Sequence, residues 1–207
     1  MTRPGRSARR QVSELDRVFK PQTEVALIDF GGVLCHYVPT PECLDLTRQH
    51  LGRSVHLTRW LFNHPASRQG LVGRLSAEDV LRQTAARAGL PVETVFQIWT
   101  AFVAANVVDA ALLDALQRYR RRARVFILTN YWSNARDVIF SKIPRDAVDG
   151  VFVSAELGMK KPQRSLWRHL IGAFGRPPGA LALLDDEEPN IRAASSAGLS
   201  GHLWVRR

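Results

Sequence analysis

The sequence predicts an α/β protein in which a three-layer, doubly wound parallel sheet carries an inserted all-helical domain. Four short apolar runs, separated by helical patterns, are typical of buried strands that alternate with helices. Such alternation favours a parallel sheet with helices on both faces. One interval between runs is too long for a single crossover helix, which indicates an insert. The runs lie at residues 24–30, 125–129, 151–154 and 181–185.

The N-terminal residues 1–22 are polar and basic, and we expect them to form a flexible tail that ends at Pro21. The first apolar run begins directly after this tail and is followed by Gly31 and Gly32. A short apolar run followed by two glycines is typical of a buried strand that enters a tight turn. The core is therefore predicted to start at about residue 23.

Residues 37–109 are predicted to be a helical domain inserted after the first strand. Helix starts are indicated by Thr40 before a proline, by a capping box that begins at Ser76, and by Pro91 in a first turn. Gly89 fits the C-terminal end of the helix that begins at Ser76. We find no convincing strand pattern between about residues 36 and 110.

The other three apolar runs belong to the second part of the core, so residues 23–36 and 110–207 are predicted to form one domain around the insert. Helical patterns cover residues 163–174 and 189–197. The composition, 45% hydrophobic and 23% charged, is that of a globular protein. A chain of 207 residues can bury a core without disulfides or a structural metal.

Composition and charge exclude several classes of protein. The apolar runs are far shorter than the ~20 residues of a membrane span, and the N-terminus lacks the apolar stretch of a secretory signal. Cys35 and Cys43 have no metal-ligand spacing, which fits free thiols in a reducing cytoplasm. The net charge of +10 includes a basic cluster at residues 118–124, but cations there complement a helix C-terminus and no nucleic-acid-binding motif accompanies them. We expect a cytoplasmic protein without a nucleic-acid or membrane partner.

Polar side chains follow the predicted strands at the point where each strand ends. In open α/β sheets, ligands bind outside the carboxyl ends of the strands. A carboxylate, a hydroxyl, a lysine and a carboxylate pair are therefore expected to meet at one edge of the sheet. These residues are Asp29 after the first run, Thr129 and Asn130 at the second, Lys161 after the third, and Asp185 with Asp186 at the fourth.

The order and spacing of these residues resemble the four motifs of the haloacid dehalogenase superfamily of phosphohydrolases, from about residue 24 to the C-terminus. Residues 29–34 are similar to the first motif, Thr129-Asn130 to the second, and Lys161-Pro162 to the third. Asp185-Asp186 with Asn190 is similar to the fourth. The insert resembles the family's helical cap, and the branch that contains sugar-phosphate phosphatases is the most similar.

The resemblance implies a phosphatase that works through an aspartyl-phosphate intermediate and Mg²⁺. Asp29 is implied as the nucleophile that attacks phosphorus in line. A cation must offset the repulsion between carboxylate and phosphate, and oxygen ligands suit Mg²⁺. The implied catalytic residues are Asp29, Thr129, Asn130 and Lys161; the implied substrate-binding residues are Gly31, Gly32, Thr129, Asn130 and Lys161; the implied metal ligands are Asp29, Asp185, Asp186 and the carbonyl of Gly31.

Gly31 departs from the family pattern, in which a second Asp protonates the leaving group and then activates water. General acid–base assistance is worth ~10²–10⁴ in rate. We therefore expect substrates with activated leaving groups, such as sugar 1-phosphates. His36 is a candidate replacement base, although a loop histidine without catalytic role is the simpler interpretation.

Two alternatives to a phosphatase remain open: a dehalogenase-like hydrolase that acts at carbon, and a catalytically silent domain that binds a phosphorylated ligand or a protein partner. The carboxylate pair disfavours the first, and the retention of three further motifs disfavours the second. We expect a small phosphorylated metabolite as substrate and a monomer or homodimer. Cap residues that either face a ligand or simply belong to the cap core or surface are Trp60, His64, Arg68 and Trp99.

Overall fold

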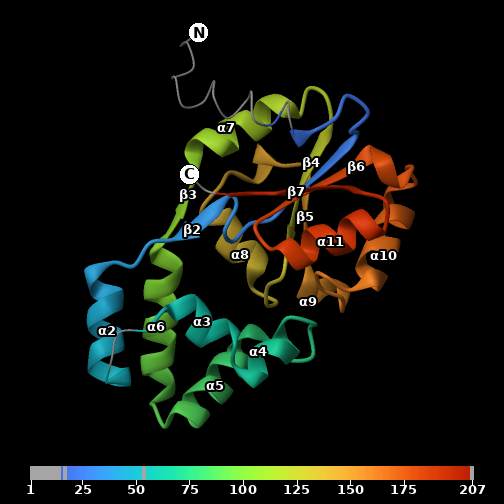
Figure 1. Ribbon diagram of the computed structural model, residues 1–207. Coiled ribbons are helices and arrows are strands. Elements are labelled where there is room, and N and C mark those ends of the chain that lie inside the picture. The colour runs from blue at the N-terminus through green and yellow to red at the C-terminus, as the bar shows by residue number, and fades with distance from the viewer. Residues whose placement is uncertain (1–14, 16–17, 53–54, 206–207) are drawn as a thin grey trace.

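The computed structural model describes residues 15, 18–52 and 55–205. Its centre is a five-stranded parallel sheet with the strand order β5-β4-β1-β6-β7 (Figure 1). The first strand along the chain therefore lies in the middle of the sheet, which is the doubly wound order. The strands are β1 (Val25–Ile28), β4 (Arg124–Thr129), β5 (Gly150–Val153), β6 (Leu181–Asp185) and β7 (Ser200–Leu203).

Helices cover both faces of this sheet, so every side chain of β1 is buried. Ala26 and Ile28 belong to one apolar cluster, and Val25 and Leu27 to another. This alternation is the strand period of two, with both faces packed. The first cluster includes residues of α7 (Ala110–Tyr119) and α8 (Ala135–Phe140), and the second includes residues of α10 (Arg164–Phe174) and α11 (Glu188–Ser196). The predicted three-layer α/β class is confirmed.

The helical cap lies beyond one end of the sheet (Figure 1). Its predicted boundary signals are present: the Thr40 and Ser76 hydroxyls accept hydrogen bonds from Cys43 N and Asp79 N, and Gly89 adopts the left-handed conformation at a helix end. These groups satisfy backbone atoms that a helix terminus leaves open. The cap helices are α2 (Pro41–Leu51), α3 (Leu57–Phe62), α4 (Pro65–Gly70), α5 (Ala77–Ala88) and α6 (Val92–Ala104).

The absence of strands between residues 36 and 110 was a wrong prediction. The chain enters and leaves the cap through two short antiparallel strands, β2 (Cys35–Tyr37) and β3 (Asn106–Val108), which pair with each other. Each has three residues, too few to show an alternating pattern. Their pairing depends on bringing together segments about 70 residues apart, which the local sequence does not indicate.

Two other differences concern the ends of the chain. β7 was not predicted because it contains Ser200, Gly201 and His202 and lacks an apolar run; it forms by pairing with β6 at the sheet edge. Within the predicted flexible tail, Leu15 and Phe19 are buried, and the Phe19 ring packs 4.9 Å from the ring of Tyr119. That part of the tail belongs to the core, and the rest of the prediction, on residues 1–14 and 16–17, lies outside the described residues.

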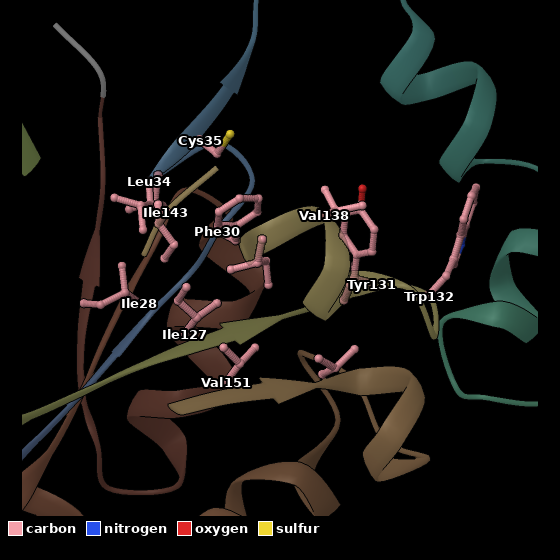
Figure 2. Packing of buried hydrophobic residues seen from close by; sticks show 14 of the residues in the cluster. Ile28, Phe30, Leu34, Cys35, Ile127, Tyr131, Trp132, Val138, Ile143 and Val151 are labelled. Atoms are coloured by element: carbon pink, nitrogen blue, oxygen red, sulfur yellow. The ribbon is translucent and has the colours of Figure 1, made fainter. Parts of the chain in front are cut away.

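The cap is joined to the core by hydrogen bonds as well as by the β2–β3 ribbon. Trp132 Nε1 donates to the hydroxyl of Ser67 at 2.9 Å, and Ala77 N donates to the hydroxyl of Ser133 at 3.0 Å. Figure 2 shows Trp132 beyond the end of β4, beside the cap helices. These contacts hold the cap over the carboxyl end of the sheet. Across residues 15, 18–52 and 55–205, no helix combines the length and apolar character needed to span a membrane.

Candidate active site

The predicted site residues meet at the carboxyl edge of the three central strands. Asp29 follows β1 directly, Thr129 ends β4 and Asp185 ends β6. Since β1 lies between β4 and β6, these three positions are neighbours. Lys161 comes from the segment between α9 (Ser154–Leu157) and α10, and its ammonium reaches the same place. The expected convergence is confirmed.

Asp29 lies at the start of a tight loop that holds its carboxylate in place. Its Oδ1 accepts from the backbone N–H of Phe30 at 2.7 Å and contacts Lys161 Nζ at 2.9 Å. The loop closes through hydrogen bonds from Cys35 N to Phe30 O and from Gly32 N to Cys35 O. Asp29 is 8% exposed, so the residue is nearly buried but still in contact with solvent.

Lys161 is buried, and both its ammonium group and its backbone are held by neighbouring side chains. Its Nζ contacts Asp185 Oδ2 at 2.6 Å in addition to Asp29 Oδ1. The side-chain amide of Asn130 bonds the Lys161 backbone twice, because Nδ2 donates to Lys161 O and Oδ1 accepts from Lys161 N, both at 2.9 Å. With its oxygen and one of its N–H groups committed, Asn130 positions Lys161. The predicted second and third motifs are therefore one unit in space.

The two adjacent aspartates have different surroundings. Asp185 is fully buried, and its Oδ1 accepts from Asn190 Nδ2 and from Glu187 N, each at 2.9 Å. Both of its oxygens are thus bonded, one to Lys161 and the other to the start of α11. Asp186 is exposed and lines the cavity between the core and the cap. Asp185 supports the site, while Asp186 presents a carboxylate to it.

The site carries more negative than positive charge. Asp29, Asp185 and Asp186 each place a carboxylate oxygen within 4.8 Å of the others, and Lys161 is the cation that bonds two of them. Burial raises the pKa of Asp29 to about 7; Lys161 opposes this shift, while Asp185 and Asp186 reinforce it.

Two other groups titrate outside their ordinary range for related reasons. Burial alone would lower the pKa of Lys161, but Asp29 and Asp185 outweigh it, so its pKa is raised and the ammonium form is kept. Burial, and then the charge of Asp185, raise the pKa of Asp186. The carboxylates thus resist being charged together, as expected where a cation is needed to complete a site. Their oxygens are ligands that suit Mg²⁺.

The two glycines of the first loop have different constraints. Gly32 has a φ of +87°, and a Cβ there would overlap Asp186 Oδ2 and lie 2.5 Å from its Cγ. Gly31 lies outside the left-handed region, and a Cβ built on it meets no atom within 4 Å. Gly32 is therefore required for close approach of the loop to Asp186, whereas Gly31 leaves an open space where the family pattern has a carboxylic acid.

A cavity of about 660 Å³ opens above these groups, between the core and the cap. Its floor includes Asp29, Thr129, Lys161 and Asp186, and the cap contributes much of the rest of its lining. The volume falls within the ~300–1,000 Å³ of typical small-molecule sites. This cavity joins the predicted catalytic groups to a space for an organic group.

Of the cap residues considered from sequence, Arg68 lines the cavity. His64 instead accepts from Ala66 N at the start of α4, Trp99 packs against Trp132, and Trp60 packs against the main apolar cluster. His36 also lines the cavity, but it is a buried residue of β2, so its interpretation as a loop histidine was wrong.

Sequence reasoning missed four aromatic residues of the lining: Tyr37, Phe62, Phe102 and Tyr131. Three of them lie in or beside the cap, where aromatic residues at helical spacing indicate only a packed core. Tyr131 offered a signal, since it follows Thr129 and Asn130 directly. Their common location depends on how the cap sits on the core.

Comparisons with known proteins give matches that cover most of the chain. The family model described as haloacid dehalogenase-like hydrolase matches residues 23–198. A sesquiterpene phosphatase from Aspergillus oryzae is 23% identical over 183 residues, which cover 86% of this chain and 88% of that protein.

Two solved structures share the fold. A haloacid dehalogenase family enzyme from Bacteroides thetaiotaomicron, crystallised with magnesium and inorganic phosphate, has a TM-score of 0.73 and 20% identity, over 87% of this chain and 93% of that one. An L-2-haloacid dehalogenase from Xanthobacter autotrophicus, with chloropropionic acid covalently bound, has a TM-score of 0.61 and 16% identity, over 86% and 76%.

Proposed function

Because the chain belongs to the haloacid dehalogenase-like hydrolase family, we propose that it is a magnesium-dependent phosphatase that forms an aspartyl-phosphate on Asp29. The observation that carries this proposal is the position of Lys161 Nζ, 2.9 Å from Asp29 Oδ1 and 2.6 Å from Asp185 Oδ2, with the Asp186 carboxylate beside them. A carboxylate that is to attack a phosphate dianion needs such surrounding positive charge and a place for a divalent cation.

Asp29 attacks phosphorus through one carboxylate oxygen, and the bond from phosphorus to the leaving oxygen breaks in the same displacement. Its Oδ1 is bonded to Phe30 N and Lys161 Nζ, which leaves Oδ2 for the attack. Water then attacks phosphorus, inorganic phosphate leaves, and the carboxylate is regenerated. Thr129 ends β4 and lines the cavity, where its hydroxyl would hold the transferring oxygens.

The metal would be held by Asp29, Asp186 and the Gly31 carbonyl, with Asp185 in support. The donor set supports this assignment, because three carboxylates have oxygens within 4.8 Å of one another and Lys161 contacts only Asp29 and Asp185 among them. When bound, Mg²⁺ offsets the repulsion between the carboxylates and the phosphate. The magnesium and phosphate in the Bacteroides thetaiotaomicron structure support the same assignment.

The leaving group must depart without an acid from position 31, because Gly31 carries none and the space above it is open. Activated leaving groups are therefore favoured. A sugar 1-phosphate is the substrate that the sequence resemblance suggests, and the name of the Aspergillus oryzae relative supports the broader class of phosphorylated small molecules.

The dehalogenase alternative shares the nucleophile but needs no cation. Asp186 argues against it, since an extra open carboxylate beside Asp29 has no use in attack on carbon and hinders an anionic substrate. The silent-domain alternative leaves unexplained why Lys161, Asn130 and Asp185 form a fully bonded support for Asp29. Both are tested together with the phosphatase.

The test is release of inorganic phosphate from acetyl phosphate, whose acyl leaving group needs no acid. We expect turnover that depends on Mg²⁺ and falls below a few per cent in Asp29→Asn, with an unchanged far-UV circular dichroism spectrum. The control is Asp137→Asn, an exposed carboxylate that does not line the cavity. Activity retained in Asp29→Asn would remove Asp29 as nucleophile. Chloride release from 2-chloropropionate in EDTA would support the dehalogenase instead, and no turnover of either substrate would support the silent domain.

A further inference from the structure

Four of the aromatic residues that line the cavity form one continuous surface, which we call the ring wall: Tyr37, Phe62, Phe102 and Tyr131. The ring centroids of Tyr37 and Phe102 are 5.3 Å apart, those of Phe102 and Phe62 are 6.0 Å apart, and those of Phe62 and Tyr131 are 5.3 Å apart. These are the separations of rings in direct contact. The wall spans β2, α3, α6 and the segment after β4, and therefore bridges cap and core.

The ring wall is supported from behind, so its shape is set before a ligand binds. Phe62 stacks on Trp132 with a centroid distance of 4.7 Å, and Trp132 stacks on Trp99 at 5.0 Å. Trp132 is further fixed by its hydrogen bond to the Ser67 hydroxyl. Rings held in this way lose little freedom when they bind a ligand, which favours affinity.

The cavity combines a charged floor with the aromatic ring wall. Asp29, Lys161 and Asp186 form a charged floor, and Phe102 and Tyr131 are buried in the wall. On the cap, the lining residues His56, Asn63 and Arg68 are exposed to solvent. Floor and ring wall line the same cavity, so a ligand bound at the floor can extend onto the rings. A hydrocarbon group packed on these rings gains from burial, whereas sugar hydroxyls packed on ring carbons lose hydrogen bonds to water.

We propose that the substrate carries an apolar hydrocarbon group that packs on the ring wall while its phosphate lies at Asp29. This rests on the proposed phosphatase function and names a different substrate class from the sugar phosphate expected from sequence. Phe62 is central to specificity, since it contacts both Phe102 and Tyr131 and is itself only half-buried.

The test compares kcat/KM for 1-naphthyl phosphate, phenyl phosphate and glucose 1-phosphate, with acetyl phosphate as the reference for the chemical step. Phenyl and naphthyl phosphates have leaving groups of similar acidity, so their ratio reports on packing. We expect kcat/KM for the naphthyl ester to be about tenfold higher than for the phenyl ester, which corresponds to ~1.4 kcal/mol. The difference between the naphthyl ester and glucose 1-phosphate should be larger. Phe62→Ala should raise KM for the naphthyl ester and so remove most of its advantage in kcat/KM over the phenyl ester.

Phe174→Ala is the matched control, because Phe174 is also half-buried and packs with Phe126 and Phe152, away from the cavity. It should preserve the naphthyl-to-phenyl ratio. Phe62→Leu, which keeps an apolar side chain, should give an intermediate ratio and serves if the alanine variant does not fold. Glucose 1-phosphate equal to or better than the naphthyl ester, or an equal loss in Phe62→Ala and Phe174→Ala, would overturn the proposal.

Calorimetric binding of 1-naphthylmethyl phosphonate and methyl phosphonate gives a readout that needs no turnover. We expect the naphthyl compound to bind at least tenfold more tightly in wild type and the difference to shrink in Phe62→Ala. If no phosphate ester is hydrolysed, the phosphatase proposal fails, yet this preference would still support the ring wall. If esters are hydrolysed but the two phosphonates bind alike, the ring wall proposal fails and the phosphatase proposal stands.

Discussion

Replacing Gly32 with alanine should damage the protein far more than replacing its neighbour Gly31. The two residues are adjacent in the first loop, and both line the cavity. Gly32 has a left-handed φ of +87° and lies against the Asp186 carboxylate. Gly31 has neither constraint, since its φ is outside the left-handed region and no atom lies within 4 Å of an added Cβ. The pair therefore forms an internal control.

The expected magnitude follows from these contacts. A left-handed alanine costs ~1–2 kcal/mol, and moving the Asp186 side chain off its rotamer costs ~0.5–1.5 kcal/mol. Gly32→Ala should thus lower the free energy of unfolding by about 2–3 kcal/mol, which corresponds to about 5–10 °C in Tm for a chain of this size. Gly31→Ala should leave the free energy of unfolding unchanged or raise it by up to ~1 kcal/mol, because alanine reduces the conformational freedom of the unfolded chain.

The assay is urea unfolding of wild type and both variants, followed by thermal melts with EDTA and with millimolar Mg²⁺. Displacement of Asp186 should also shrink the Mg²⁺-dependent rise in Tm in Gly32→Ala but not in Gly31→Ala. If both variants unfold at the same urea concentration and keep the full Mg²⁺ effect, the close approach of Gly32 to Asp186 is not as described.

Three further predictions concern the charged floor of the cavity. Mg²⁺ should raise the Tm of wild type, by ~2.7 kcal/mol of stability at 100 times its Kd, and Asp186→Ala should abolish the rise; identical melting in EDTA and Mg²⁺ would contradict the metal assignment. In metal-free protein the pKa of Asp29 is raised from 3.8 to about 7. Between these pH values the native state therefore holds a proton that the unfolded chain lacks. The stability that this proton contributes is lost as the pH rises from about 4 to 7. Urea midpoints measured across that window should therefore fall less steeply in Asp29→Asn than in wild type, and equal slopes would refute the shift. Gly31→Asp should fold, because space is available for the side chain. It should raise kcat/KM for primary-alcohol phosphates by up to ~10²-fold, and by less for phenyl phosphate. Equal effects on both substrates in a folded variant would show that protonation of the leaving group does not limit the wild type.

The central strands of the sheet could be predicted from sequence because each of them is a short run of apolar residues. Val25 to Ile28 and Leu181 to Leu184 are apolar throughout, and a strand buried on both faces needs such a run. β7 could not be predicted, because Ser200, Gly201 and His202 carry no such pattern and become a strand only by pairing with β6. The same holds for β2 and β3, whose pairing spans the whole cap.

The floor of the site was predictable for a related reason. Asp29, Thr129 and Asp185 each follow or end a recognisable strand, and the parallel order of those strands brings their ends together. The different tasks of neighbouring residues were not predictable. Asp185 is bonded to Lys161 and Asn190 while Asp186 is open, although the two are adjacent and chemically identical.

The sequence by itself determined which groups gather at the sheet edge, because chain order and strand pattern dictate where Asp29 and Lys161 come together. Only the tertiary structure decided what faces them. Tyr37, Phe62 and Tyr131 lie on three separate segments, and in the sequence they cannot be distinguished from ordinary core residues. They become a wall because the β2–β3 ribbon and the Trp132 to Ser67 hydrogen bond place the cap over the core. Packing between distant segments, which no local pattern encodes, therefore shapes the space available to the substrate.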